Sequence, residues 1–239
     1  MVATSTPKSA QMNSGPGFRI RLDIERPSRE LIDQFRQFDT PDISDMLNRM
    51  YAMNNDIHDM SGGGPICGPA CTVKVFPGDN LMVHKVLDVA KPGDVVVVDA
   101  GGSKSNAVLG DLICTKARHR GIAAFVIDGL VRDLPDIIAD GFPVYACGET
   151  PIGPLHRGPG EINFTVSCGG VVVNPGDIIV GDKAGIVVIR RDFASETLQR
   201  LNEQKTTLDP YVDSVKRGEF SNEWVDRYLN ETNCTITPG

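Results

Sequence analysis

The residues of this chain best placed to do chemistry follow an apolar run at 121–127. The run ends at the turn residue Gly129, beyond which come Arg132, Asp133 and, three residues later, Asp136. A continuous apolar run is typical of a strand buried on both faces, and the loops that leave such strands often carry function. A guanidinium beside carboxylates suits the task of holding a carboxylate-bearing substrate next to a hard divalent metal ion.

The alternative is that Arg132 and Asp133 form an ion pair on a surface turn, worth at most about 1 kcal/mol. Two observations favour chemistry instead. Asp136 lies one helical turn beyond Asp133 and reinforces the same charge cluster. Asp111 follows Gly110 where a loop enters a predicted helix, and the backbone N–H groups at a helix start are a natural anion site.

Apolar periodicity and turn residues predict the elements that must position these side chains. We expect helices at 29–38, 40–51, 81–90, 101–120 and 134–140, and strands at 71–76, 95–98, 123–127, 144–146, 169–173, 178–182 and 185–189. The segment 193–230 reads as amphipathic helix interrupted at Asp209-Pro210. Pro-Gly-Asp occurs before two of the strands, at 92–94 and 175–177, and fits a tight turn. Helices mixed with short strands predict a layered α/β domain.

The composition of the chain limits the classes of function that it can have. The 239 residues are 41% hydrophobic and 23% charged, with a net charge of -7, which is ordinary for a globular protein. No Lys/Arg cluster is present, so we expect no nucleic-acid partner. Residues 1–20 read as a disordered lead-in without the apolar core of a signal peptide, and no segment reaches membrane-spanning length. The six cysteines show no metal-ligand spacing, and we expect packed thiols in a cytoplasmic protein.

A string of ordered motifs carries a family resemblance. In chain order, the motifs are Gly78-Asp79-Asn80-Leu81, Lys91-Pro92-Gly93-Asp94, Val98-Asp99-Ala100-Gly101-Gly102, Gly110-Asp111-Leu112, Arg120-Gly121, Asp128-Gly129-Leu130-Val131-Arg132-Asp133, Gly141-Phe142-Pro143-Val144 and Gly181-Asp182-Lys183-Ala184-Gly185. Together they resemble the RraA-like superfamily, which includes class II 4-hydroxy-4-methyl-2-oxoglutarate / 4-carboxy-4-hydroxy-2-oxoadipate aldolases and regulators of ribonuclease E. The resemblance runs from about residue 35 to the end of the C-terminal helix.

The resemblance implies roles for particular residues. Arg132 matches the arginine that grips the carboxylate of a 2-oxo acid, and Asp133 matches the aspartate that binds the metal, largely through waters. Asp136, which we also assign to the metal site, matches an acidic residue that distinguishes the aldolases from the ribonuclease regulators. Asp111 matches the acidic position of the Gly110 loop, with the amides of Leu112 and Ile113 receiving the substrate carboxylate. Glu203 is our assignment for the acid that a neighbouring subunit contributes.

The activity implied is a class II carbon–carbon lyase that releases pyruvate from 4-hydroxy-2-oxo acids, with oxaloacetate decarboxylation as a side activity. Mg²⁺ or Mn²⁺ would stabilise the pyruvate enolate as a Lewis acid. The chemical competitor is a Schiff-base mechanism on Lys104 or Lys116. Two other functions stay open, a non-catalytic binding protein of the ribonuclease E regulator type and another lyase or hydrolase using the same metal site.

The fold implied is a layered αββα sandwich of the swivelling β/β/α type, forming a single domain over 21–239 with C-terminal helices. Such proteins are homotrimers or dimers of trimers, with sites between subunits. Of the four histidines, His84 resembles a family position near the pocket, although a supporting helix residue is an equal interpretation. We expect His58, His119 and His156 to be solvated or locally hydrogen-bonded, because they lack partners that would make a ligand set.

Overall fold

The computed structural model describes residue 8 and residues 11–237, without the side chains of 207–209. The chain divides into two compact units, one that ends at Leu198 and one over 199–239. Most of the expected lead-in, 1–7 and 9–10, lies outside the described residues. The first unit ends in the first turns of a long helix, and the expected single domain over 21–239 stays a prediction.

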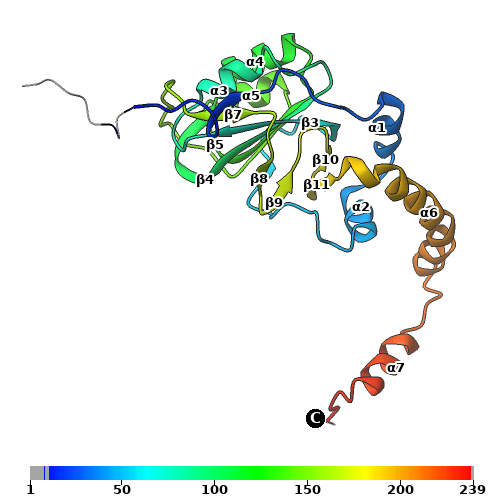
Figure 1. Cartoon of the computed structure of the whole chain (residues 1–239). Helices are drawn as coiled ribbons and strands as arrows, with labels where there is room; N and C mark the ends of the chain where they lie inside the picture. The colour runs from blue at the N-terminus through cyan, green and yellow to red at the C-terminus, as the bar shows by residue number, and fades with distance from the viewer. Residues whose placement is uncertain (1–7, 9–10, 238–239) are drawn as a thin grey trace, which may run out of the picture. The chain divides into compact units, whose positions relative to one another are not determined.

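The first unit alternates short helices and strands around one large sheet (Figure 1). The strands are β1 (Phe18–Ile20), β2 (His58–Asp59), β3 (Ile66–Val75), β4 (Val95–Leu109), β5 (Ala124–Val131), β6 (Val144–Ala146), β7 (Gly160–Ile162), β8 (Val166–Cys168), β9 (Val171–Val173), β10 (Ile178–Asp182) and β11 (Gly185–Ile189). The helices are α1 (Arg29–Phe35), α2 (Thr40–Met46), α3 (Leu81–Val86), α4 (Asp111–His119) and α5 (Leu134–Asp140), followed by α6 (Ala194–Lys216), which starts in this unit.

The strands of the main path lie in the order β1-β7-β3-β4-β5-β6-β2, with β3, β4, β5 and β6 parallel. Strand β3 also belongs to a second layer, because its first residues pair with β10 and its later residues pair with β4. Helices α3, α4 and α5 cover one face of the sheet, and β8 to β11 lie against the other (Figure 1). Helix α2 packs in turn against β10 and β11, which confirms the expected layered α/β fold.

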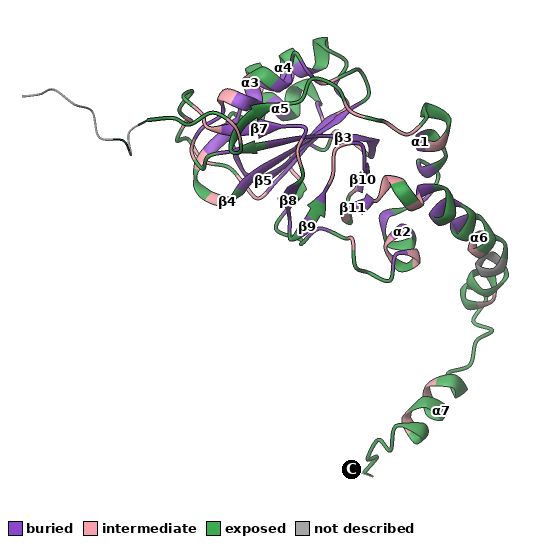
Figure 2. Ribbon diagram, in the orientation of Figure 1, coloured by how far each residue is buried: buried purple, intermediate pink, exposed green. Residues whose placement is uncertain are grey.

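Side-chain alternation along the parallel strands explains why they read as continuous apolar runs. Val96 and Val98 of β4 point into a cluster that includes residues of α3, α4 and α5. Val95 and Val97 point the other way, into a cluster that includes residues of β8 to β11. Because successive strand residues face opposite sides, a strand between two cores must be apolar at every position. The buried strands between exposed helix surfaces show this arrangement in Figure 2.

The two Pro-Gly-Asp turns are built alike, as the sequence predicted. Gly93 and Gly176 both have positive φ, of 91° and 87°, which glycine adopts without strain. The aspartate that follows each glycine is buried and folds back on its own turn. Asp94 accepts a hydrogen bond from the Lys91 N–H at 2.8 Å, and Asp177 accepts one from the N–H three residues before it, also at 2.8 Å.

Several predicted elements differ from the structure. The strand expected over 123–127 continues through Gly129 to Val131, so no turn lies there, and the helix expected over 40–51 ends at Met46. The helix expected over 101–120 begins only at Asp111, because residues up to Leu109 continue β4 and pair irregularly with β5. Gly110, between them, has an extended backbone that no helix can contain. The lead-in expected up to residue 20 ends before Phe18, since β1 pairs in parallel with β7. The C-terminal helix continues through Pro210 instead of breaking there.

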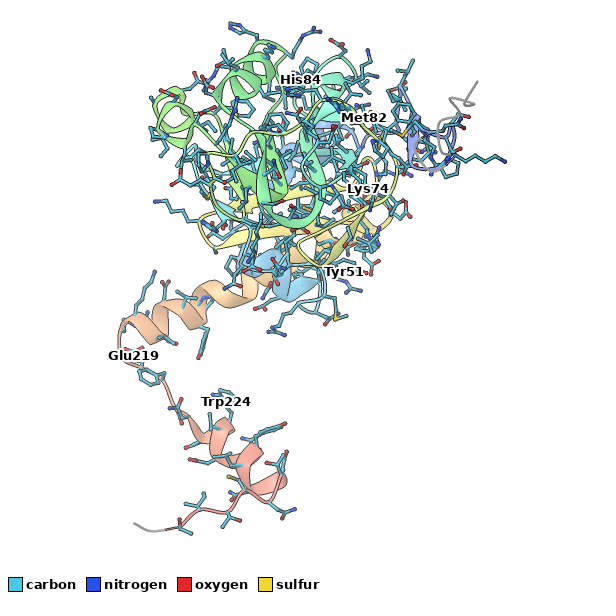
Figure 3. The ribbon with its side chains drawn as sticks, turned by 90° about the vertical axis from the view of Figure 1, so that its left-hand side faces the viewer. Tyr51, Lys74, Met82, His84, Glu219 and Trp224 are labelled. Carbon is cyan, nitrogen blue, oxygen red and sulfur yellow. The ribbon has the colours of Figure 1, made fainter. Side chains whose placement is uncertain are left out.

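The C-terminal unit holds the rest of α6 and α7 (Glu223–Glu231). It exposes several large apolar side chains, among them Trp224 and Tyr228 of α7; Figure 3 labels Trp224. Within the described residues, no helix combines the length and apolar character needed to cross a bilayer. All six cysteines are free, and burial raises the pKa of Cys71 and Cys114 to about 12, as expected for packed thiols. Cys147 is only partly buried and Cys234 is exposed, so the expectation is wrong for Cys234.

Candidate functional site

Two loops that carry predicted site residues meet because β4 and β5 are parallel neighbours. Leu109 at the end of β4 is in register with Val131 at the end of β5. Gly110 follows the first strand and Arg132 follows the second. The Arg132 N–H donates to the Leu109 carbonyl at 3.0 Å, which fixes the two loops side by side. The carboxyl ends of adjacent parallel strands are a common place for a ligand site in α/β folds.

Arg132 and Asp133 form an ion pair, with Nε and Oδ2 3.2 Å apart. Their side chains are 44% and 38% exposed, so the pair adds little to stability. Asp133 has a left-handed backbone, with φ 57° and ψ 37°, and caps the start of α5. A non-glycine residue in this region is uncommon and often marks a functional site. The pair is thus better suited to binding than to holding the fold together.

Glycines allow the backbone to approach this pair closely. A Cβ atom on Gly110 would lie 2.3 Å from Oδ2 of Asp133, and one on Gly153 would lie 2.6 Å from Nη1 of Arg132. Gly110 itself has φ -142°, which any residue can adopt. Glycine is therefore needed at this position because a Cβ atom would not fit, and not because of the backbone conformation.

The start of α4 faces the same place. Gly110 is the N-cap, so Asp111 and Leu112 are the first helical residues, and their N–H groups have no acceptor within the helix. The Ile113 N–H donates back to the Gly110 carbonyl at 3.1 Å. Of the two amides that the resemblance assigns to the substrate carboxylate, Leu112 is the one left open within α4. A helix start also carries partial positive charge, which favours an anion.

These residues line one pocket of about 210 Å³. The pocket contains Gly110, Asp111, Leu112, Ile113, Arg132 and Asp133, which are the predicted site residues of the two loops. Asp136 lies in the first turn of α5, is exposed, and is not among the lining residues. Glu203 lies on α6 in the C-terminal unit, where it accepts a hydrogen bond from Gln199 at 2.8 Å. Its contribution to another subunit's site stays a prediction.

Sequence reasoning gave no place in the pocket to Asn80 and His156, which line it together with Lys116, the lysine considered above for a Schiff base. The Asn80 side chain donates to the Val108 carbonyl at 2.8 Å, and its Oδ1 lies 2.6 Å from Nδ1 of His156. The local hydrogen bonding expected of His156 is therefore confirmed. The sequence did not predict that His156 lines the pocket, because His156 lies in a loop outside the family motifs.

His84 lines the pocket from α3, where Figure 3 labels it with its neighbour Met82. Its ring stands edge-on to that of His156, with centroids 5.2 Å apart. Burial lowers the pKa of His84, and the nearby His156 and Lys116 lower it further. Arg132 and Lys116 are the arginine and the lysine among the lining residues of this pocket.

The donor set fits one kind of metal ion. Among the described residues no group of three or more His, Cys, Asp or Glu side chains is placed to hold a metal. A structural or catalytic zinc site needs at least three protein ligands and does not fit. Mg²⁺ and Mn²⁺ accept oxygen ligands, and Mg²⁺ usually keeps several waters beside one or two carboxylates. The half-exposed carboxylate of Asp133 offers such a ligand.

Comparison with known proteins agrees with the family resemblance found in the sequence. Residues 40–188 match the family model described as RraA-like, Aldolase/RraA. The chain belongs to the RraA-like family. A relative from Halalkalibacterium halodurans is 40% identical over 176 residues, which cover 74% of this chain and 84% of the relative. That relative is named "Putative 4-hydroxy-4-methyl-2-oxoglutarate aldolase", and the name supports an aldolase-type lyase.

Solved RraA-like structures share the fold. Streptomyces coelicolor RraAS2, described as an unusual member of the RNase ES inhibitor family, matches with a TM-score of 0.69 and 27% identity. The match covers 77% of this chain and 96% of RraAS2. The RNA-processing inhibitor RraA from Thermus matches with a TM-score of 0.59 and 31% identity, over 64% of this chain and 92% of that one. RraA-like proteins thus include both named aldolases and named inhibitors of RNA processing.

Proposed function

We propose that this RraA-like protein is a divalent-metal-dependent aldolase that cleaves 4-hydroxy-2-oxo acids to pyruvate and an oxo compound. The observation that carries the proposal is the Arg132–Asp133 pair, which lines one pocket together with the start of α4. The named aldolase relatives support the same reaction class.

The pocket offers three kinds of group to a 2-oxo acid. Arg132 presents a planar guanidinium, which binds a carboxylate through paired hydrogen bonds. The N–H groups at the start of α4 would bind a carboxylate oxygen as well. Lys116 adds a second positive charge. The overall charge of -7 gives no long-range attraction for an anion, so affinity must come from these local groups.

Bond cleavage also needs a base and a means to stabilise charge. Asp111 is half-buried at the helix start and would hold the water that removes the proton from the C4 hydroxyl. Asp133 would hold Mg²⁺ or Mn²⁺, with Asp136 proposed to support the ion from the next turn of α5. The metal ion would supply Lewis-acid stabilisation of the negative charge that develops on the 2-oxo group. The same arrangement would decarboxylate oxaloacetate, because that reaction develops the same charge.

Two alternatives have specific support. Lys116 lines the pocket, so a Schiff base on its amine is chemically available. Borohydride treatment with pyruvate would trap such an adduct on Lys116 and contradict the metal-dependent reaction. The second is binding of a ribonuclease, which the names of the RraA structures favour. Capture of a ribonuclease without any turnover of a keto acid would support that function instead.

The deciding experiment measures pyruvate release from 4-carboxy-4-hydroxy-2-oxoadipate, 4-hydroxy-4-methyl-2-oxoglutarate and oxaloacetate, with Mg²⁺ and with EDTA. We expect Mg²⁺-dependent release that Asp133→Ala abolishes. Asp192→Ala is the matched control, because Asp192 is 88% exposed and lies outside the pocket. Release that survives EDTA, or is unaffected by Asp133→Ala, would refute the proposal.

We further propose that the working form is a homotrimer or a dimer of trimers, in which Glu203 of one subunit completes the pocket of the next. Analytical ultracentrifugation gives the mass, and mixing Glu203→Ala chains with Arg132→Ala chains tests the exchange. If each site combines the two residues from different subunits, mixed assemblies regain part of the activity that both variants lack alone.

A further inference from the structure

A second pocket, of about 440 Å³, lies at the other end of β4 and β5. Its lining includes Asp94 and Gly121, which precede these two strands, whereas Gly110 and Arg132 follow them. The two pockets share no lining residue. The second pocket is therefore separate from the proposed reaction site, and what it binds is a separate question.

Three arginines line this second pocket, in a chain whose overall charge is negative. Arg26 is tied down by Asp94, with Nε to Oδ1 at 2.8 Å and Nη2 to Oδ2 at 2.7 Å. The Arg26 side chain is 15% exposed and that of Asp94 is 1% exposed. This pair is a neutral, fixed part of the wall, because each charge is matched by the other in bidentate geometry.

The other two arginines share one carboxylate. Arg36 donates from Nε to Asp33 at 3.0 Å and from Nη2 to the Cys67 carbonyl at 2.7 Å. Arg29 reaches the other oxygen of Asp33 at 3.6 Å, and its side chain is 91% exposed. Two guanidiniums against one carboxylate leave one positive charge. Arg29 is held loosely enough to turn its planar donor groups toward a ligand.

Apolar side chains form part of the remaining lining. Ile32 and three prolines line the pocket, at positions 27, 69 and 92. Burial raises the pKa of the Cys67 thiol to about 11, so that sulfur is not a nucleophile at neutral pH. The pocket combines an apolar body with a single excess positive charge. Its volume lies within the range of sites for small organic molecules and exceeds what an inorganic ion would fill.

We propose that this pocket is a binding site for a small organic acid with one carboxylate and a flat apolar body, held by Arg29 and Arg36. The excess of one charge selects a monocarboxylate over a phosphate monoester, which carries close to two negative charges at pH 7. Binding here does not depend on the proposed aldolase reaction.

Isothermal titration calorimetry with benzoate, phenyl phosphate and benzyl alcohol tests the proposal on the full chain. Benzoate has the required charge and shape, phenyl phosphate has the larger charge, and benzyl alcohol is the neutral analogue. We expect benzoate to bind more tightly than the other two, and Arg29→Gln to weaken it about tenfold, since a charge-assisted hydrogen bond is lost. Arg29→Gln will leave the fold intact, as thermal unfolding will show, because the side chain is exposed.

Two control variants locate the binding. Arg49→Gln removes another exposed arginine, one that pairs with Asp45 outside the pocket, and should leave the affinity for benzoate unchanged. Arg132→Gln should also leave it unchanged, because Arg132 belongs to the other pocket. Any of four results would overturn the proposal. Two concern the analogues, namely benzyl alcohol binding as tightly as benzoate, or phenyl phosphate binding more tightly. The other two are the loss of benzoate binding in Arg132→Gln and the absence of binding at about 5 mM benzoate.

Discussion

Gly110→Ala should disable the site while leaving the fold nearly intact. The new Cβ would lie 2.3 Å from Oδ2 of Asp133, whereas ordinary contact begins at 3.4 Å. The carboxylate must therefore move by about 1 Å. Asp133 has a short side chain that forms an ion pair with Arg132, and its backbone is the N-cap of α5. A displacement of this size in a reacting group costs about a hundredfold in rate.

The assay is pyruvate release at saturating Mg²⁺, followed with lactate dehydrogenase. We expect kcat/KM to fall about a hundredfold, and the free energy of unfolding to fall by about 1–3 kcal/mol, as is usual when a packed site is overfilled. The double variant Gly110→Ala/Asp133→Ala separates the causes. Without the carboxylate the alanine meets no Oδ2, and only the milder contacts with Cγ and Nε of Arg132, at 3.0 and 3.3 Å, remain, so its cost in unfolding free energy should become smaller.

Two results would refute this reasoning. If Gly110→Ala kept at least a third of the wild-type kcat/KM, the position of the Asp133 carboxylate would not matter to the reaction. If the alanine cost the same unfolding free energy with and without Asp133, the clash would be with another group. Gly153→Ala is a useful comparison, because its Cβ would meet the end of the Arg132 side chain, which can swing away.

Two further predictions concern pH and stability. The lowered pKa of His84 means that the unfolded chain binds its proton more readily, so stability should be fully present above the unfolded pKa of about 6.5 and fall as the pH drops below it. Urea unfolding at pH 7.5 and 5.5 should show a smaller loss in His84→Gln than in the wild type, and an equal loss would contradict the burial of this ring. Asp94→Ala should cost about 3–5 kcal/mol, because it leaves the guanidinium of Arg26 mostly buried without its partner. Asp88→Ala, which removes an exposed carboxylate, should cost less than about 1 kcal/mol in the same experiment.

The sequence predicted the parts of the fold that local pattern determines. Helix α5 and strand β6 have the expected bounds, and the Pro-Gly-Asp turns form as expected, because apolar period and turn chemistry act over a few residues. The same reasoning gave a wrong prediction for residues 101–109. A helix was expected from residue 101, but residues 101–109 continue β4 because they pair with β5, which is a long-range contact that no local pattern contains.

Some residues of the candidate site could likewise be predicted from the sequence, and others could not. Arg132 and Asp133 could be found because they follow a strand that the sequence predicts, whereas the Gly110 loop was found from its motif, inside a stretch that was predicted as helix. His156 and Asn80 could not, since they meet across 76 positions of the chain through a hydrogen bond that only the folded structure shows. The sequence did not predict the second pocket. Its three arginines come from residues 26–36, whereas its other lining residues include 67, 69, 92–94 and 121, which are distant in the chain.

The connection between β4 and β5 passes both pockets. It leaves the first at Gly110, runs through the nine residues of α4, and reaches the second at Gly121. Recombination between family members that exchanges this short segment would therefore transfer the anion-facing start of α4 and one wall of the second pocket together. The two pockets cannot diverge independently through such exchanges, and a chimaera made at these boundaries would inherit a change in both.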